Sequence, residues 1–191
     1  MADKYGSFDE LRRGEREGVD YNIRVVRRRN ASVAITAPHA GKIEPGTSEI
    51  ADAIAGDACS LYCFEGTKQN ENFDLPITSA NFDEPQCVEL VAAHDQIISV
   101  HGLAGMRRQV VEVGGLDTVL RDAICKGLQD AGFSAEVITS GVLAGLSPSN
   151  ICNKGARRRG VQLEITRGLR DVLVARRQGL TDFARAVRLA I

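Results

Sequence analysis

Two of the three histidines in the sequence each follow a short apolar run. His39 comes shortly after SVAITA, residues 32–37, and His101 comes directly after QIISV, residues 96–100. Ligands of open α/β sheets bind beyond the carboxyl ends of the strands, so both imidazoles would project into one crevice if these strands are neighbours. The third histidine, His94, falls at the end of a predicted helix, where a cationic side chain suits the helix dipole. The first two histidines therefore indicate a metal site.

Glu44 is the residue that would complete this site. It follows His39 through the flexible Gly41 and precedes the turn Pro45-Gly46, so the loop can fold its carboxylate back toward the imidazole. Two imidazoles and one carboxylate are a common ligand set of catalytic zinc ions, which keep the fourth position for water. One zinc ion at this position is one interpretation, and a structural histidine and glutamate are the other, because a pair at this spacing does not by itself separate the two.

Glu164 lies within VQLEIT, residues 161–166, a mostly apolar segment that we expect to form a strand. A buried carboxylate without a partner is costly, so the residue needs a partner or a chemical role. One explanation is a general base, which takes a proton as an activated water attacks a carbonyl. The other explanation is a salt bridge to Arg157 or Arg167, and the position in the strand does not separate the two.

The charge is balanced overall but uneven along the chain. A formal net charge of -1, with 26% charged residues, gives no global positive field for duplex nucleic acid, and we expect no such partner. Basic residues nevertheless gather near the end of the chain: Lys154, Arg157, Arg158, Arg159, Arg167 and Arg170. Such a cluster suits a small or extended anionic ligand, and a solvated charged loop is the alternative.

The composition favours one domain. The chain has 191 residues, of which 43% are hydrophobic, enough for a single core, so we expect one domain over residues 1–191. The five cysteines form no CxxC pair, which argues for core residues rather than disulfides or a thiolate zinc site. No signal peptide or membrane-spanning run is present, so we expect a cytoplasmic protein without membrane contact; a phage enzyme released by lysis fits equally well.

Short apolar strands alternate with amphipathic helices along the sequence. This alternation predicts an α/β three-layer sandwich around a mixed, largely parallel sheet. We expect the segment 32–37 to be a central strand that Pro38 ends, and the segment 96–100 to end directly at His101. The expected strands are 21–29, 32–37, 59–66, 96–100, 109–113, 134–139 and 161–166, and the expected helices are 7–17, 47–56, 84–94, 116–131 and 181–191.

Three segments together resemble the phage-type poly-γ-glutamate hydrolase family, which is also found in bacterial prophages. They are APHAGKIEPGTSEIA, SVHG and NICNKGARRRGVQLEIT, which match in order, and the resemblance extends from about Tyr5 to Arg170. Members of the family are zinc enzymes similar in fold to zinc carboxypeptidases and to the succinylglutamate desuccinylase and aspartoacylase group. Carboxypeptidases typically space the first two ligands as HxxE, whereas the HxxxxE spacing found here is usual in the hydrolase family.

The resemblance implies roles for individual residues. Matched by position, His39, Glu44 and His101 are the zinc ligands, and Glu164 is the catalytic base. The expected reaction is hydrolysis of the amide between a glutamate γ-carboxyl group and the next α-amino group, in an anionic γ-glutamyl polymer or oligomer. We expect the basic stretch to bind substrate carboxylates, with these contacts from Asn153, Lys154 and Arg157.

The sequence is also compatible with two other functions. The first is a zinc-dependent deacylase that removes the acyl group from an N-acyl glutamate or aspartate, which would need a closed pocket. The second is a phage-derived binding or replication-associated protein whose metal is only structural, although structural zinc sites usually have four protein ligands. The sequence does not give the stereochemistry of the glutamate accepted, endo or exo cleavage, the natural substrate or the oligomeric state.

Overall fold

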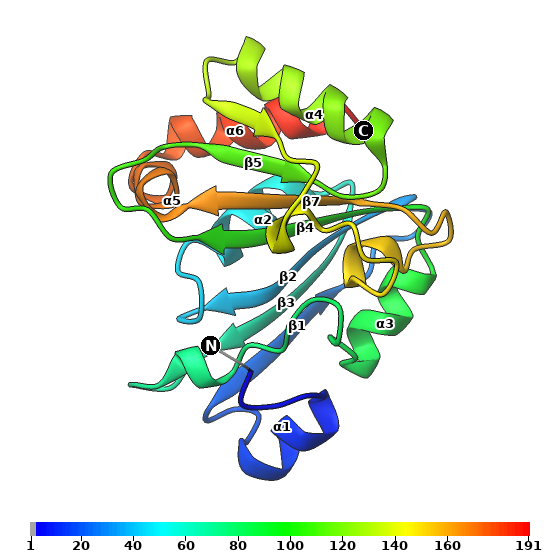
Figure 1. Ribbon diagram of the computed structural model, residues 1–191, viewed down its shortest axis with the longest axis vertical. Coiled ribbons are helices and arrows are strands. Elements are labelled where there is room, and N and C mark those ends of the chain that lie inside the picture. The colour runs from blue at the N-terminus through cyan, green and yellow to red at the C-terminus, as the bar shows by residue number, and fades with distance from the viewer. Residues whose placement is uncertain (1–2) are drawn as a thin grey trace.

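The central element of the protein is a seven-stranded mixed β-sheet with the strand order β1-β3-β2-β4-β7-β5-β6 (Figure 1). The computed structural model describes residues 3–191. The four middle strands, β3, β2, β4 and β7, run parallel to one another, while β1 and β5 run antiparallel to their neighbours β3 and β7. The strands are β1 (Tyr21–Val26), β2 (Val33–Gly41), β3 (Ser60–Gly66), β4 (Gln96–Leu103), β5 (Val111–Gly114), β6 (Ala135–Val137) and β7 (Val161–Thr166).

Helices cover both faces of the sheet. One face packs against α2, α4, α5 and α6 through a large apolar cluster, and the other packs against α1, α3 and the segment 75–82 through a second cluster. Burial on both faces explains why the middle strands are apolar along most of their length. The helices are α1 (Phe8–Gly14), α2 (Thr47–Ala55), α3 (Pro85–Ala92), α4 (Thr118–Asp130), α5 (Arg167–Ala175) and α6 (Arg177–Arg188). None of the helices between residues 3 and 191 is both long and apolar enough to cross a membrane.

The predicted α/β sandwich with a mixed sheet is confirmed, as is the burial of the cysteines. Cys59, Cys63, Cys87, Cys125 and Cys152 are all buried and free. Burial raises the pKa of each of these thiols, and that of Cys152 reaches about 12. They therefore act as small core residues.

Two strands continue past the ends that the sequence predicted. Pro38 does not end β2, because the register with β3 shifts between Ala37 and Ala40 and pairing then resumes to Gly41. A proline is tolerated at such an irregularity, where the ladder does not require its N–H. Strand β4 does not end at His101 either, because it stays paired with β7 as far as Leu103. Both histidines therefore stand within strands rather than on loops.

The C-terminal region contains more helix than the sequence predicted. The predicted helix over 181–191 is α6, which begins earlier, at Arg177. Directly before it, α5 follows β7 without a loop and buries Leu169 and Leu173, a helix that the sequence analysis missed. Helix α1 and strand β1 are shorter than predicted.

Candidate metal centre

His39 lies on β2 within the irregularity that also contains Pro38, and it is 9% exposed. Its Nε2 donates a hydrogen bond to the carbonyl oxygen of Ile77 at 2.9 Å, because a carbonyl oxygen can only accept. Its Nδ1 faces Glu44 Oε1 at 3.3 Å. Burial alone would lower the pKa of His39, but the charge and hydrogen bond of Glu44 raise it overall. The ring is thus held so that Nδ1 points into the site.

His101 lies on the neighbouring strand β4 and is buried. Its Nε2 is hydrogen-bonded to Ser99 Oγ at 2.9 Å and lies 3.3 Å from Ser79 Oγ. Its Nδ1 lies 4.0 Å from Glu44 Oε2, and the centroids of the two imidazoles are 5.0 Å apart. Burial, together with the nearby His39, lowers the pKa of His101 to about 4, so the ring is neutral, as a metal ligand must be.

Glu44 reaches both histidines because its loop turns sharply after β2. Gly41 has φ 65°, and a Cβ at this position would lie 2.7 Å from the carbonyl oxygen of Gly66, so only glycine fits. The N–H of Gly102 donates to Glu44 Oε2 at 2.6 Å. Burial would raise the pKa of Glu44, but His39, His101 and this N–H lower it overall, so the carboxylate is ionised.

The three predicted ligands converge in the structure. One donor atom from each of His39, Glu44 and His101 lies within 4.8 Å of the other two, and across residues 3–191 this is the one such cluster of three or more possible ligands. Two nitrogens and one carboxylate oxygen match the chemistry of a catalytic zinc site. The other nitrogen of each ring is hydrogen-bonded to a carbonyl or hydroxyl group, as is usual for metal-binding histidines. The donor set therefore fits a divalent metal such as zinc.

Glu164 lies beside His101 in the register between β7 and β4, and its side chain is buried. Burial and then the charge of Glu44 raise the pKa of Glu164 to about 8. The salt bridges considered from the sequence are not formed, since Arg157 is exposed and Arg167 pairs with Asp171 at 2.7 Å. Glu164 instead accepts a hydrogen bond from a neutral side chain, that of Gln162.

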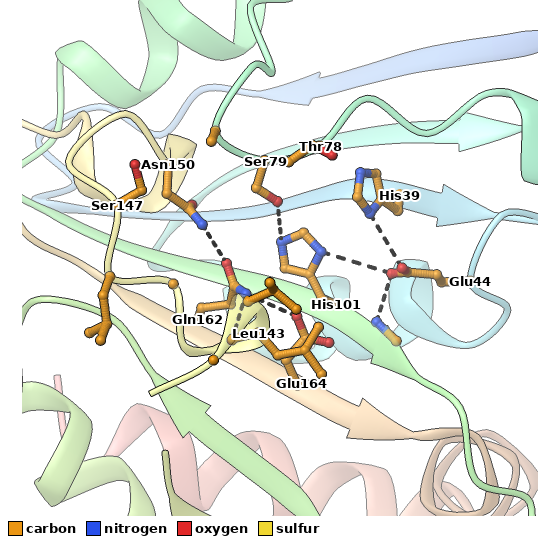
Figure 2. A pocket seen from close by; sticks show the side chains of 16 residues that line it. His39, Glu44, Thr78, Ser79, His101, Leu143, Ser147, Asn150, Gln162 and Glu164 are labelled. Atoms are coloured by element: carbon orange, nitrogen blue, oxygen red, sulfur yellow. Dashed lines mark hydrogen bonds and ion pairs between the residues drawn. The ribbon is translucent and has the colours of Figure 1, made fainter. Parts of the chain in front are cut away.

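The ligand cluster and Glu164 open into one cavity of about 420 Å³ (Figure 2). Within residues 3–191, none of the side chains that line this cavity belongs to a lysine or an arginine. The walls come from the segment 78–80 on one side and the loop 141–150 on the other. The lining residues are His39, Glu44, Thr78, Ser79, Ala80, His101, Gly102, Gly141, Val142, Leu143, Gly145, Leu146, Ser147, Asn150, Gln162 and Glu164.

Residues 5–184 match the family model described as poly-gamma-glutamate hydrolase. The chain belongs to the poly-γ-glutamate hydrolase family. A bacteriophage poly-gamma-glutamate hydrolase structure superimposes with a TM-score of 0.93 at 36% identity, covering 99% of this chain and 96% of that one. A zinc-free apo structure of YndL gives a TM-score of 0.92 at 34% identity, covering 99% and 97%.

One relative of this chain is the SPbeta prophage-derived protein YoqZ of Bacillus subtilis. It is 44% identical over 168 residues, which are 86% of this chain but 59% of YoqZ, so the chain spans well under two thirds of that relative. An N-formylglutamate amidohydrolase from Ralstonia eutropha shares the fold alone, with a TM-score of 0.51 at 14% identity over 90% of this chain and 95% of that one.

The substrate-binding residues predicted from the sequence lie outside the cavity of this hydrolase family member. Asn153 is buried and donates to the carbonyl oxygens of Gly145 at 2.7 Å and Ser147 at 2.9 Å, so both of its N–H donors are used. Lys154 donates to the carbonyl oxygen of Phe82 at 3.3 Å, and Arg157 is exposed. Contacts between the substrate and Asn153, Lys154 or Arg157 therefore stay predictions. The positions of these three residues outside the cavity argue against such contacts.

Other residues of the site were not found from the sequence. Gln162 had a visible signal, because it is polar in an apolar strand and stands two positions before Glu164, on the same face. Ser79 gave no signal, because it comes from an irregular segment that reaches His101 only in the folded chain. His94 lies away from the site and binds Leu90 O at 2.6 Å and Ser60 Oγ at 2.9 Å, which is a structural role.

Proposed function

We propose that the protein hydrolyses γ-glutamyl amide bonds of poly-γ-glutamate with one zinc ion bound by His39, Glu44 and His101. The observation that carries this proposal is the convergence of these three side chains beside Glu164 in one cavity. The family match over residues 5–184 and the bacteriophage hydrolase of nearly equal length support the substrate class. The zinc-free YndL structure supports zinc as the metal.

The two histidines and Glu44 are held ready for a cation by hydrogen bonds to their outer atoms. A bound zinc ion supplies a Lewis acid that polarises the scissile carbonyl and makes water more acidic. The Nε2–H bond to Ile77 fixes the ring of His39, and the Gly102 N–H fixes the carboxylate of Glu44. The chain thereby presents ligand atoms that need little rearrangement on binding.

Glu164 is the proposed general base. Its carboxylate would take a proton from the attacking water and later deliver it to the departing α-amino nitrogen, so the cleaved amide yields one carboxylate and one amine. Burial and Glu44 raise the pKa of Glu164 to about 8 in the metal-free protein, so the group holds a proton readily. A nearby cation would favour its ionised form, which is the form needed at the first step.

Neutral donors in the cavity are the proposed partners of the substrate carboxylate. Ser147 and Thr78 line the cavity and are exposed, and hydroxyl groups of this kind can donate to a carboxylate oxygen. The proposed role of Lys154 and Arg157 is to attract polymer units that lie beyond the cavity, since a polymer of γ-linked glutamate is a polyanion. We retain that contribution, and a contact from Asn153, as parts of the proposal to be tested.

The decisive experiment compares substrates. The zinc-loaded protein would be incubated with γ-glutamyl oligomers and, separately, with N-acyl glutamate and N-acyl aspartate, and the products read by mass spectrometry. Shortened γ-glutamyl oligomers are expected; cleavage of the N-acyl amino acids alone would replace the proposal by the deacylase. The Glu164→Gln variant should bind zinc but lose about 100-fold or more in kcat. Full activity of that variant would exclude Glu164 as the base.

A further inference from the structure

A chain of three hydrogen bonds between buried groups leads to Glu164. It begins at the N–H of Cys152, which donates to Asn150 Oδ1 at 3.0 Å. Asn150 Nδ2 donates to Gln162 Oε1 at 2.8 Å, and Gln162 Nε2 donates to Glu164 Oε1 at 2.9 Å, as Figure 2 shows. Asn150, Gln162 and Glu164 are all buried where they border the cavity, which limits the access of water to these bonds.

The direction of this chain is fixed at its first bond. A backbone N–H can only donate, so the oxygen of the Asn150 side chain faces Cys152 and its NH₂ faces Gln162. The same argument applies to Gln162, whose oxygen must face Asn150 and whose NH₂ must face Glu164. Reversing one amide would oppose two oxygens or two NH₂ groups. The carboxylate therefore always meets an N–H donor from Gln162.

Gln162 also holds the wall of the cavity. The second hydrogen of its Nε2 goes to the carbonyl oxygen of Leu143 at 3.0 Å. Leu143 and its neighbour Val142 line the cavity. A Cβ at Gly145, which has φ 62°, would lie 3.0 Å from the Cβ of Gln162, so the loop packs tightly on this side chain. One amide therefore connects the base to the loop that faces the substrate.

We infer that Gln162 is a positioning residue for Glu164, and that Asn150 supports it by holding the oxygen end of the Gln162 amide. This inference rests on the proposed role of Glu164. Within the part of the chain that the structure describes, the carboxylate of Glu164 has no other hydrogen-bond partner than Gln162. Since Oε1 is engaged by Gln162, Oε2 is the oxygen that exchanges the proton with water and with the leaving amine.

The Asn150→Asp variant tests this arrangement without touching Glu164. Aspartate keeps an oxygen for the N–H of Cys152 but has no donor for Gln162 Oε1, so this bond is lost and the Gln162 amide is held only at Nε2, by Leu143 O and Glu164 Oε1. We expect kcat at saturating substrate to fall about 10- to 100-fold, as for a misplaced catalytic group, with bound zinc unchanged. KM should rise as well, because Asn150 lines the cavity and the new charge repels an anionic substrate, so kcat is the quantity compared. Gln162→Leu should behave similarly, and Asn150→Ser, which replaces the amide by a shorter neutral hydroxyl, should lose less.

Ser149→Asp is the matched control for charge. Ser149 is exposed and stands next to Asn150, so the same negative charge is added while the amide chain stays intact. Its Oγ lies 2.7 Å from the Oγ of Ser147, a proposed substrate contact, so the comparison is made on kcat and not on KM. This variant should keep nearly all of kcat, whereas its KM should rise because the new charge lies beside Ser147. An equal loss of kcat in Ser149→Asp and Asn150→Asp would overturn the inference, because charge would then be the cause.

An independent readout comes from the side-chain NH₂ signals of Gln162 in the metal-free protein, followed by ¹H–¹⁵N NMR. These signals can be assigned by their loss in Gln162→Leu. They should shift in Asn150→Asp and stay in place in Ser149→Asp; unshifted signals in Asn150→Asp would overturn the inference. If the wild-type protein cleaves no γ-glutamyl substrate, the proposed function fails, while the NMR result still reports whether Asn150 holds the Gln162 amide.

Discussion

Ser99 Oγ and His101 Nε2 are hydrogen-bonded at 2.9 Å, two residues apart on the same face of β4. The bond occupies the nitrogen that points away from Glu44 and leaves Nδ1 directed at the proposed metal. Such outer partners commonly change metal affinity by about 10- to 100-fold when they are removed. Because Ser79 also lies near this nitrogen, at 3.3 Å, the two hydroxyl groups share the role.

We therefore expect Ser99→Ala to weaken zinc binding, and Ser79→Ala combined with Ser99→Ala to weaken it by about 10-fold or more. Affinity can be measured by competition with a chelator of known zinc affinity. Ser60→Ala is the matched control, because Ser60 makes the same kind of bond to His94, at 2.9 Å, away from the site. An unchanged zinc affinity in the double variant would show that the hydroxyl groups do not support the ligand.

The ligand set itself predicts metal content. His39→Ala and His101→Ala should each lose most of the bound zinc, since either change leaves only two protein ligands. Elemental analysis of protein purified without chelators checks this against an expected single equivalent in the wild type. His94→Gln is the control and should keep its zinc. If the wild-type protein holds no divalent metal and takes up none when zinc is added, the assignment of the ligands is wrong.

Much of this ligand set was predictable because parallel strands place their carboxyl ends together. His39, His101 and Glu164 follow or lie in three apolar segments, and these segments are β2, β4 and β7, which are adjacent in the sheet. The sequence could not give this order, because it depends on contacts between distant segments. It also could not show that Pro38 lies within β2, where a shift in register replaces the expected strand end.

The substrate-binding side chains were harder to predict, because residues that are only a few positions apart in sequence can lie far apart along an extended strand. Arg157 is only seven positions before Glu164, but it precedes the first residue of β7, Val161, and the site is near the other end. At about 3.3 Å per residue, Val161 already lies about 10 Å from Glu164 along the strand, and Arg157 comes before Val161. The cavity walls instead come from loops whose sequences carry little signal.

The raised pKa of Glu164 predicts an effect of pH on the stability of the metal-free protein. The pKa is about 8 when folded, above the ordinary value of 4.5, so the buried group destabilises the fold increasingly as the pH rises from 4.5 through 8. Glu164→Gln cannot ionise and should avoid this loss, gaining on the order of a few kcal/mol near about pH 8, at about 1.4 kcal/mol for each pH unit.

Thermal unfolding in the presence of a chelator, at several pH values from about 5 to about 8, checks this dependence. The gain in Tm of Glu164→Gln over the wild type should grow with pH and be smallest at the acid end. Glu136→Gln is the control, because Glu136 is exposed and its ion pair with Arg108, at 3.3 Å, contributes little. A gain that does not change with pH would mean that burial of the Glu164 charge is not what costs stability.

The placement of Arg157 predicts how its loss affects substrates of different length. Arg157 is exposed and does not line the cavity, so Arg157→Ala should keep kcat and KM within about twofold on the shortest γ-glutamyl oligomers that are cleaved. If the residue attracts distant units of the polymer, KM for long chains should rise, and this difference should shrink at high salt because screening removes it. Loss of activity on short oligomers would instead show a direct contact with the substrate, as the sequence predicted.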